Sequence, residues 1–250
     1  MPAYDFKAPR LFVETPLAAG TVLPLERAQA NYLINVLRRG EDDPVLVFNG
    51  RDGEWHTRLV ATGRKDGQLH CVAQTRPQHP PSDLHYLFAP LKSARLDYLA
   101  QKAVEMGAGL IRPVITRYTQ GDRINMDRLQ ANAIEAAEQC GILAIPELAP
   151  PLRLDEALAG LDEARLLIFC DEDASISDPV RALSEAADPA NPPPLAVLVG
   201  PEGGFSEEER AAIRARPNTV ALSLGPRILR ADTAAVAVLA LVQAVLGDGR

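Results

Sequence analysis

The sequence predicts an α/β protein in which a parallel sheet with crossover helices follows a small, mostly β module. From residue 84 onward, short apolar runs alternate with longer amphipathic segments, which is the pattern of a parallel sheet connected by helices. Residues 10–76 instead hold short strand-like runs separated by the turn dipeptides Asn49-Gly50 and Asp52-Gly53. Between these parts, residues 76–81 contain three prolines, which is typical of a linker.

The first module is expected to form four strands and one helix. Alternating or β-branched runs predict the strands at residues 10–14, 44–48, 54–60 and 67–74. Apolar residues at helical spacing predict a helix over residues 26–39, which would end at Arg38 and Arg39. We therefore divide the chain into an N-terminal domain of residues 1–76, a linker of residues 77–83 and a C-terminal domain of residues 84–250.

In the second module, strands and helices alternate in order along the chain. Strands are expected at residues 84–90, 110–116, 165–170, 195–199 and 220–224, and helices at residues 96–106, 127–140, 155–160, 179–187 and 232–246. A further helix is expected to begin after Ser206 as its N-cap, with an acidic first turn at residues 207–209. Gly107 and Gly141 follow two of these helices and are expected to cap their C-termini. The last helix is apolar on nearly all sides, which predicts burial in the core or in a subunit interface.

Composition narrows the functional classes. A chain of 250 residues with 47% hydrophobic residues can bury a full core, and it contains no apolar run long enough to span a membrane. Cys71, Cys140 and Cys170 lie far apart and outside any C-x-x-C pair, so we expect reduced cysteines in a cytoplasmic protein. The four histidines show no metal-ligand spacing, and we expect no metal site.

The net charge of −7 is unevenly distributed. Residues 1–130 hold 17 Lys and Arg against 14 Asp and Glu, whereas residues 131–250 hold 9 against 19. A surface that binds nucleic-acid phosphates is therefore expected in the N-terminal half.

Two loops near the C-terminus carry the strongest functional signal. Each follows a short apolar strand and begins with Gly-Pro, at residues 200–201 and 225–226. In a parallel sheet, ligands bind beyond the carboxyl ends of the strands. Glycines allow backbone groups to approach a ligand closely, and the neighbouring leucines suit a flat heteroaromatic group such as adenine. The alternative is that both loops are only tight turns.

Neither loop is a known phosphate-binding motif. No Lys-Ser or Lys-Thr follows Gly204, and no G-x-G-x-x-G follows a strand. A nucleoside triphosphate or a dinucleotide held at a helix N-terminus is therefore not expected.

Together, residues 198–206 (LVGPEGGFS) and 222–234 (LSLGPRILRADTA) resemble the SPOUT methyltransferases, and most closely the RsmE family. That resemblance implies S-adenosylmethionine as cofactor, a C-terminal trefoil knot, a homodimer formed through the knotted domain, and methylation of N3 of a uridine in small-subunit (16S) ribosomal RNA. It assigns the following residues to cofactor binding: Leu198, Val199, Gly200, Pro201, Glu202, Gly203, Leu222, Ser223, Leu224, Gly225, Ile228 and Leu229.

The N-terminal module resembles the PUA-like β-barrel domain of that family, which binds RNA. Residues 10–13 and 36–38 match the family's opening strand and helix, and residues 92–107 resemble its Lys…Arg…Gln-Lys-x-x-Glu-x-Gly signature. The resemblance thus assigns RNA binding to Arg10, Arg38, Arg39, Lys92, Arg95 and Lys102. Two alternatives remain open: Arg38-Arg39 could complement a helix dipole, and Lys102 could pair with Glu105 one turn away.

Arg230, Asp232 and Arg95 are the candidate catalytic residues. Arg230 directly follows the second loop and is expected to stabilise negative charge that develops on the uracil oxygens. Asp232 is expected to hold Arg230 in place or to accept the N3 proton, and the alternative is that it only caps the last helix. Lys92 and Arg95 follow a strand end and are expected to project toward the two loops.

Three alternatives to this function remain. The chain could be a SPOUT methyltransferase for another base or a ribose hydroxyl in ribosomal or transfer RNA. It could instead be a non-catalytic RNA-binding ribosome assembly factor, or a small-molecule α/β enzyme. The last alternative leaves the arginine-bearing β module without a purpose.

Overall fold

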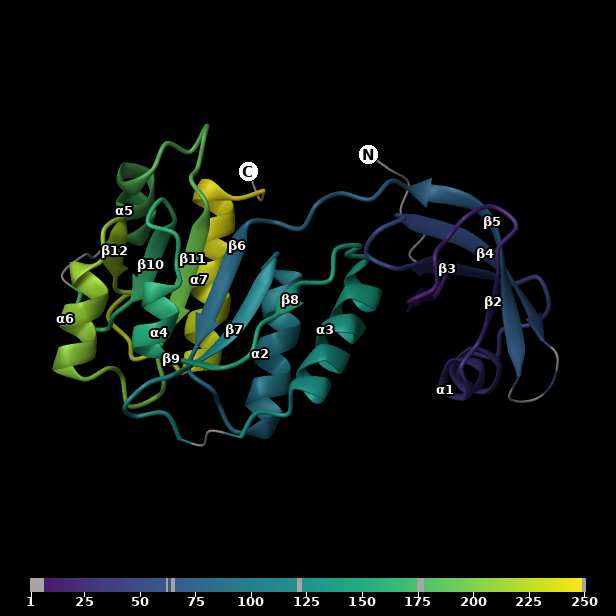
Figure 1. Ribbon diagram of the computed structural model, residues 1–250, viewed down its shortest axis with the longest axis horizontal. Coiled ribbons are helices and arrows are strands. Elements are labelled where there is room, and N and C mark those ends of the chain that lie inside the picture. The colour runs from purple at the N-terminus through teal and green to yellow at the C-terminus, as the bar shows by residue number, and fades with distance from the viewer. Residues whose placement is uncertain (1–6, 62, 64–65, 121–122, 175–177, 249–250) are drawn as a thin grey trace. The chain divides into compact units, whose positions relative to one another are not determined.

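The structure is a computed structural model that describes residues 7–248, apart from residues 62, 64–65, 121–122 and 175–177 (Figure 1). It divides into two compact units. The first comprises Met1–Pro80 with Ala137–Ile145, and the second comprises Pro81–Ala136 with Pro146–Arg250.

The first unit is built on a five-stranded sheet of order β1-β3-β4-β5-β2. Its strands are β1 (Arg10–Phe12), β2 (Val22–Pro24), β3 (Pro44–Phe48), β4 (Glu54–Ala61) and β5 (Gly67–Arg76). Strands β1 and β3 pair in parallel, and the other neighbours pair antiparallel. The four predicted strands are confirmed, and β2 was not expected from the sequence.

The predicted helix over residues 26–39 is shorter and less regular than expected. Helix α1 (Arg27–Ala30) continues directly into a π-helical segment, η1 (Asn31–Val36). The backbone N–H of Leu37 donates to the carbonyl of Tyr32 at 2.9 Å, five residues back, as a π-helix requires. Arg38 then takes φ = +55° and leaves the helical region. Arg38 and Arg39 therefore follow the helix and do not form its last turn.

A buried ion-pair cluster ties the first strand of this unit to its last. Glu54 is 3% exposed, and its carboxylate accepts hydrogen bonds from Arg10 at 3.0 Å and from Arg76 at 2.7 Å. Thr75 Oγ1 donates to the same carboxylate at 2.8 Å. Burial alone would raise the pKa of Glu54, but the hydrogen bonds from Arg76, Thr75 and Arg10 outweigh it and lower the pKa.

The second unit is organised around a fully parallel sheet of order β12-β10-β11-β6-β7-β8, with β9 pairing beside β7. Its strands are β6 (Leu84–Phe88), β7 (Leu110–Ile115), β8 (Glu147–Leu148), β9 (Leu152–Arg153), β10 (Leu166–Cys170), β11 (Leu195–Val199) and β12 (Thr219–Leu222). The predicted parallel sheet is confirmed. The key feature of the order is that β10 lies between β11 and β12.

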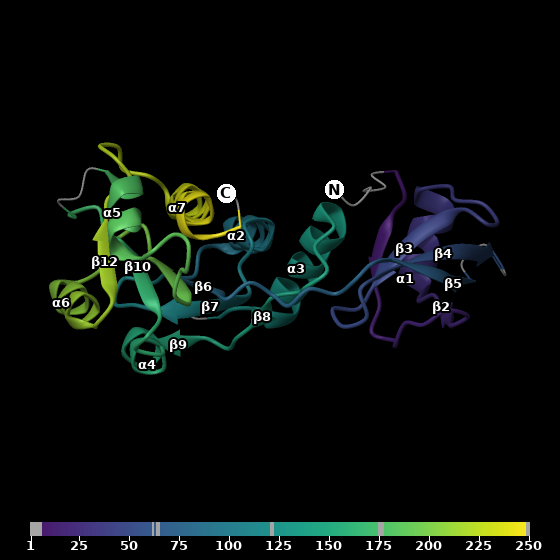
Figure 2. The same ribbon diagram turned by 90° about the horizontal axis from the view of Figure 1, so that it is seen from above.

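Helices cover both faces of this sheet. Helices α2 (Ser93–Glu105), α5 (Pro179–Ala186) and α7 (Ala231–Leu246) lie on one face, and α4 (Leu154–Ala159) and α6 (Glu207–Ala215) lie on the other (Figure 2). Helix α3 (Met126–Cys140) follows β7. Gly107 and Gly141 have φ of +77° and +67°, so the predicted glycine caps after α2 and α3 are confirmed.

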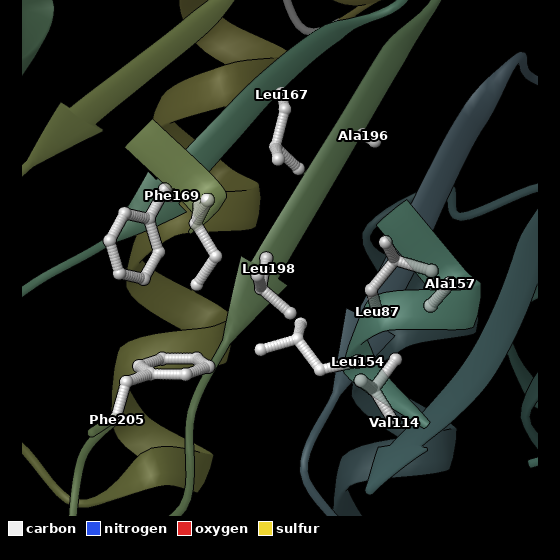
Figure 3. Close-up of a cluster of buried hydrophobic side chains, with 10 residues drawn as sticks. Leu87, Val114, Leu154, Ala157, Leu167, Phe169, Ala196, Leu198 and Phe205 are labelled. Carbon is white, nitrogen blue, oxygen red and sulfur yellow. The ribbon is translucent and has the colours of Figure 1, made fainter. Parts of the chain in front are cut away.

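A hydrophobic core cluster of this unit lies between the sheet and the helices α4 and α6. It joins Leu167 and Phe169 of β10 to Leu198 of β11 and Leu154 of α4 (Figure 3). Phe205, from the loop after β11, packs edge-on against Phe169 with ring centroids 5.1 Å apart. The loop after β11 is therefore anchored in the core by its own aromatic side chain.

Candidate functional site

A cavity of about 630 Å³ lies where the carboxyl ends of β10, β11 and β12 meet. Because these three strands are neighbours and parallel, the segments that follow them converge at one edge of the sheet. The cavity is lined by Cys170, Asp171, Glu172, Ala174, Val199, Gly200, Pro201, Glu202, Gly203, Gly204, Phe205, Leu222, Ser223, Leu224, Gly225, Pro226, Arg227, Ile228, Leu229, Ala231 and Ala234.

The two glycine loops predicted to share a ligand do lie on one cavity. Every residue predicted to bind the cofactor lines it except Leu198. The side chain of Leu198 is fully buried in the core against α4 (Figure 3) and does not line the cavity, so the assignment of Leu198 to cofactor binding stays a prediction. Successive side chains of a strand point to opposite faces of the sheet. The side chain of Leu198 therefore points into the core, and the next residue, Val199, lines the cavity. Ile228 lines the rim and is 97% exposed.

The sequence reasoning missed the third wall of the cavity. Cys170, Asp171, Glu172 and Ala174 follow β10, and none of them was a candidate. The available signal was an apolar strand that ends in the acidic run of residues 171–173. Only the strand order, which places β10 between the two loop-bearing strands, gives this run a position beside the ligand loops.

The first loop folds back tightly over its own glycine. The N–H of Gly204 donates to the carbonyl of Pro201 at 2.9 Å and closes a turn. A Cβ built on Gly200 would come within 2.4 Å of the Phe205 ring, so only glycine fits there without a shift. The hydroxyl of Ser206 then accepts from the N–H of Glu209, which confirms the predicted N-cap of α6.

Arg95, Glu202 and Asp232 come together at the mouth of the cavity. The guanidinium of Arg95 donates to the carboxylate of Glu202, and Arg95 Nε lies 4.0 Å from Asp232 Oδ2. Arg95 belongs to the first turn of α2, Glu202 to the first loop and Asp232 to the first turn of α7. The expected approach of Arg95 to the glycine loops is thus present in the structure.

Arg230 occupies the N-cap position of α7 and is exposed. It stands directly after the second loop, outside the cavity lining. Asp232 is the second residue of the helix and accepts a hydrogen bond from the N–H of Thr233 at 2.8 Å. Its side chain thus accepts from a backbone N–H in the first turn of α7, so the alternative in which Asp232 only serves the start of this helix stays an alternative. The nearest guanidinium that the structure pairs with Asp232 is that of Arg95.

The two candidate lysines on α2 differ in their surroundings. Lys92 is the exposed N-cap residue of the helix. Lys102 donates to both carboxylate oxygens of Glu105 at 2.6 Å and lies 5.4 Å from the ring centroid of Tyr98. The predicted pairing of Lys102 with Glu105 is confirmed, so an RNA contact by Lys102 would have to compete with it.

Among the candidate RNA-binding arginines of the first unit, only Arg38 is exposed. Arg39 is half-buried, and its guanidinium donates to the carbonyl of Lys7 at 2.8 Å. The side chain of Arg10 is 7% exposed and paired with the buried Glu54. The Arg10 guanidinium is thus paired inside the unit, and the assignment of RNA binding to Arg10 stays a prediction.

Burial strongly changes the acidity of one cavity residue. Desolvation, with a smaller contribution from the negative charge of Asp171, raises the pKa of the Cys170 thiol to about 12. The thiol therefore stays protonated at neutral pH and lines the cavity as a small apolar group. The acidic character of this wall comes from Asp171 and Glu172.

Within the described ranges, no group of three or more His, Cys, Asp or Glu side chains could hold a metal ion. No helix in the part of the chain that the structure describes is long and apolar enough to cross a membrane.

Comparison with known families identifies this architecture. A family model described as an RNA methyltransferase domain matches residues 78–243, and one described as an RNA methyltransferase PUA domain matches residues 25–70. The chain belongs to the RNA methyltransferase family. The family resemblance and the α/β fold class predicted from the sequence are both confirmed, and the trefoil knot stays a prediction.

Named relatives of this RNA methyltransferase agree with the assignment. The ribosomal RNA small subunit methyltransferase E of Rickettsia conorii is 28% identical over 94% of each chain. The protein of the same name from Synechocystis is 29% identical over 95% of this chain and 78% of its own length. A methyltransferase of Legionella pneumophila, solved with the bound cofactor SAM, is 29% identical with a TM-score of 0.81 over 95% of this chain and 98% of that chain.

A second solved structure shows the same fold at lower identity. The ribosomal RNA small subunit methyltransferase E of Neisseria gonorrhoeae, bound to S-adenosyl methionine, is 24% identical with a TM-score of 0.82. It covers 97% of this chain and 100% of that chain.

Proposed function

We propose that this RNA methyltransferase uses S-adenosylmethionine to methylate N3 of a uridine in 16S ribosomal RNA, in the cytoplasm and as a homodimer. The observation that carries the proposal is the single cavity shared by the segments after β10, β11 and β12. The names of the relatives, the PUA domain match and the donor-bound Legionella structure support the substrate and the cofactor.

The residues of the cavity fit this donor. Its volume of about 630 Å³ lies in the range of small-molecule sites. Leu222, Leu224 and Phe205 offer apolar surface for an adenine, and the glycine loops expose backbone donors and acceptors beside them. Glu172, whose side chain is 54% exposed, gives one wall a carboxylate that suits a cationic ligand, whereas Asp171 is buried and paired with Arg210 and Arg214.

When bound, the donor supplies an electrophilic methyl group. The chain must hold the uracil so that N3 faces this methyl group, which requires the base to leave its stack. We assign Arg230 to stabilising the negative charge that develops on the uracil oxygens as the N3 proton leaves. We assign Asp232 and Glu202 to orienting Arg95, because both carboxylates lie beside its guanidinium. Arg95 then faces the substrate side of the cavity mouth.

RNA binding is assigned to the first unit and to the N-terminal end of α2. In this assignment Arg38 and Lys92, both exposed, contact phosphates, whereas the guanidinium of Arg10 is paired with Glu54.

The homodimer is assigned to the outer face of α7. The buried residues of α7 lie on one side of the helix, and the other side leaves Ala240 and Ala244 exposed, with Ala237 and Leu241 half-buried. A helix that is apolar on both sides favours a second contact for its outer face.

The test is a labelled methyl-transfer assay on small ribosomal subunits and on free 16S RNA, with mapping of the product. The variant Arg230→Ala should bind the donor within about twofold of the wild type and lose at least about tenfold in methyl transfer, because it removes only charge stabilisation. Arg181→Ala on the exposed surface of α5 is the matched control and should change neither quantity.

Unchanged transfer by Arg230→Ala would remove Arg230 from the mechanism. A methyl group mapped to another base or to a ribose hydroxyl would overturn the N3 assignment. Donor binding without any transfer would favour the assembly factor.

A further inference from the structure

A buried ion pair, which the proposed mechanism does not use, connects all three walls of the cavity. Asp171 follows β10 and its side chain is fully buried, while the side chain of Arg210 on α6 is 7% exposed. The guanidinium of Arg210 donates to Asp171, and Arg210 Nη2 lies 2.6 Å from Glu172 Oε1. Arg210 Nη1 also lies 3.1 Å from Asp173 Oδ2, so one arginine pairs with three consecutive carboxylates after β10, two of which line the cavity.

The same pair reaches the other two walls through backbone groups. Arg210 Nε donates to the carbonyl of Phe205, the residue that ends the first glycine loop, at 3.3 Å. The N–H of Asp171 donates to the carbonyl of Leu222, at the end of β12, at 3.1 Å. This pair therefore fixes the positions of the segments after β10, β11 and β12 relative to one another.

Glycine at position 204 allows the loop to approach the pair. Gly204 has φ = +68°, and a Cβ there would lie 2.6 Å from Glu172 Oε1 and 3.4 Å from Arg210 Nη2. The loop, the guanidinium and the carboxylate are consequently in contact, and a displacement of any one of them would move the others.

Glu172 differs from Asp171 in being available to a ligand. Its side chain is 54% exposed, and it lines the cavity. Arg210 engages Oε1, and among the described residues none donates to Oε2. A carboxylate oxygen fixed at a cavity wall is a strong acceptor for an O–H or N–H group of a ligand.

We propose that Arg210 is a positioning residue of the donor cavity, which holds Glu172 so that Oε2 accepts a hydrogen bond from an O–H or N–H group of the methyl donor. This inference rests on the proposed function, because it takes S-adenosylmethionine as the ligand. Arg210 acts through Glu172 and through the loop carbonyl of Phe205, and it does not touch the reacting atoms.

The experiment measures donor affinity by calorimetry for Arg210→Lys, Glu172→Gln and the double variant. Lysine keeps the charge but cannot reach both carboxylates in a fixed fork, so Arg210→Lys should weaken donor binding about tenfold. Glu172→Gln should weaken it about fivefold, since a charged acceptor becomes neutral. The double variant should bind about as weakly as Arg210→Lys alone, because two residues that act through one contact are not additive.

Arg214→Lys is the matched control. Arg214 also donates to Asp171, but its side chain is 47% exposed and does not line the cavity, so this variant should bind the donor as the wild type does. Steady-state kinetics give a second readout. Arg210→Lys should raise the KM for the donor about tenfold and leave kcat and the KM for RNA within about twofold, which a loss of folded protein would not do.

Titration with methylthioadenosine, which has the ribose but no amino-acid end, shows which group of the methyl donor forms the hydrogen bond with Glu172. If Glu172→Gln weakens binding of this compound too, the bond comes from the nucleoside. If only S-adenosylmethionine is affected, the bond comes from the ammonium group.

Wild-type affinity in folded Arg210→Lys, or effects of the two substitutions that multiply in the double variant, would overturn the proposal. Failure of the wild type itself to bind S-adenosylmethionine would instead overturn the proposed function, so the two failures are distinguishable.

Discussion

Gly200 shows how a single missing side chain shapes the site. An alanine Cβ at this position would lie 2.4 Å from the Phe205 ring, which is itself buried against Phe169. Gly200→Ala should therefore cost about 1–3 kcal/mol in the free energy of unfolding, because overpacking displaces the ring. Donor affinity should fall about tenfold as the loop moves.

Urea unfolding and calorimetric titration check both effects. Gly40→Ala is the control, since a Cβ at Gly40 would have no atom closer than 4.0 Å. If Gly200→Ala behaved like Gly40→Ala, the packing of Phe205 over the loop would not shape the cavity.

Cys170 provides a prediction about pH. Its pKa of about 12 leaves little thiolate at pH 8, and the thiolate is the form that reacts with alkylating agents. Folded protein treated with iodoacetamide at pH 8 should be modified at the exposed Cys140 at least about 100 times faster than at Cys170. Peptide mass spectrometry measures both rates in one sample, and comparable rates would contradict the raised pKa of Cys170.

At the scale of elements, α7 links the donor cavity to the proposed dimer. Ala231 and Ala234, in its first turns, line the cavity, and Ala240 lies on its outer, exposed face. Light scattering should give the wild type a mass of twice 27.0 kDa. Ala240→Glu should give a monomer, because a charge in an apolar interface is not compensated. Ala212→Glu, on the exposed face of α6, should stay dimeric; a monomeric wild type would refute the assignment.

The elements that could be predicted are those with clear local boundaries. Strand β3 was predicted at residues 44–48 because an apolar run lies between Pro44 and the Asn49-Gly50 turn. Strand β2 was missed, since Val22–Pro24 is short and gains its pairing only from β5. The end of the first helix was misplaced because the pattern of apolar residues cannot show a π-helical turn.

Only those parts of the candidate site that have a local sequence motif could be predicted from the sequence. The glycine loops could be found because Gly-Pro turns follow apolar strands. The wall that contains Asp171 and Glu172 could not be predicted, because an acidic run has the sequence pattern of a solvent-exposed turn. Only the strand order places this run beside the cavity. The ion pair of Arg10 could not be predicted for a similar reason, because its partner Glu54 lies 44 residues away in the sequence.

At the scale of the whole molecule, the two units have separate tasks in this account. The first unit matches an RNA methyltransferase PUA domain, and the second holds the cavity within the matched methyltransferase domain. The charge distribution does not follow this division, because residues 1–80 hold 10 Lys and Arg against 9 Asp and Glu, and residues 81–130 of the second unit hold 7 against 5.

The central claim is tested most directly by mass spectrometry of 16S ribosomal RNA from cells with and without this protein. The account predicts one uridine that carries an N3 methyl group in the parent cells and lacks it in the deletion strain. Restoring the wild-type gene should return the methyl group, and restoring the Arg230→Ala variant should leave the site largely unmethylated. Identical methylation of 16S RNA in parent and deletion strains would contradict the account.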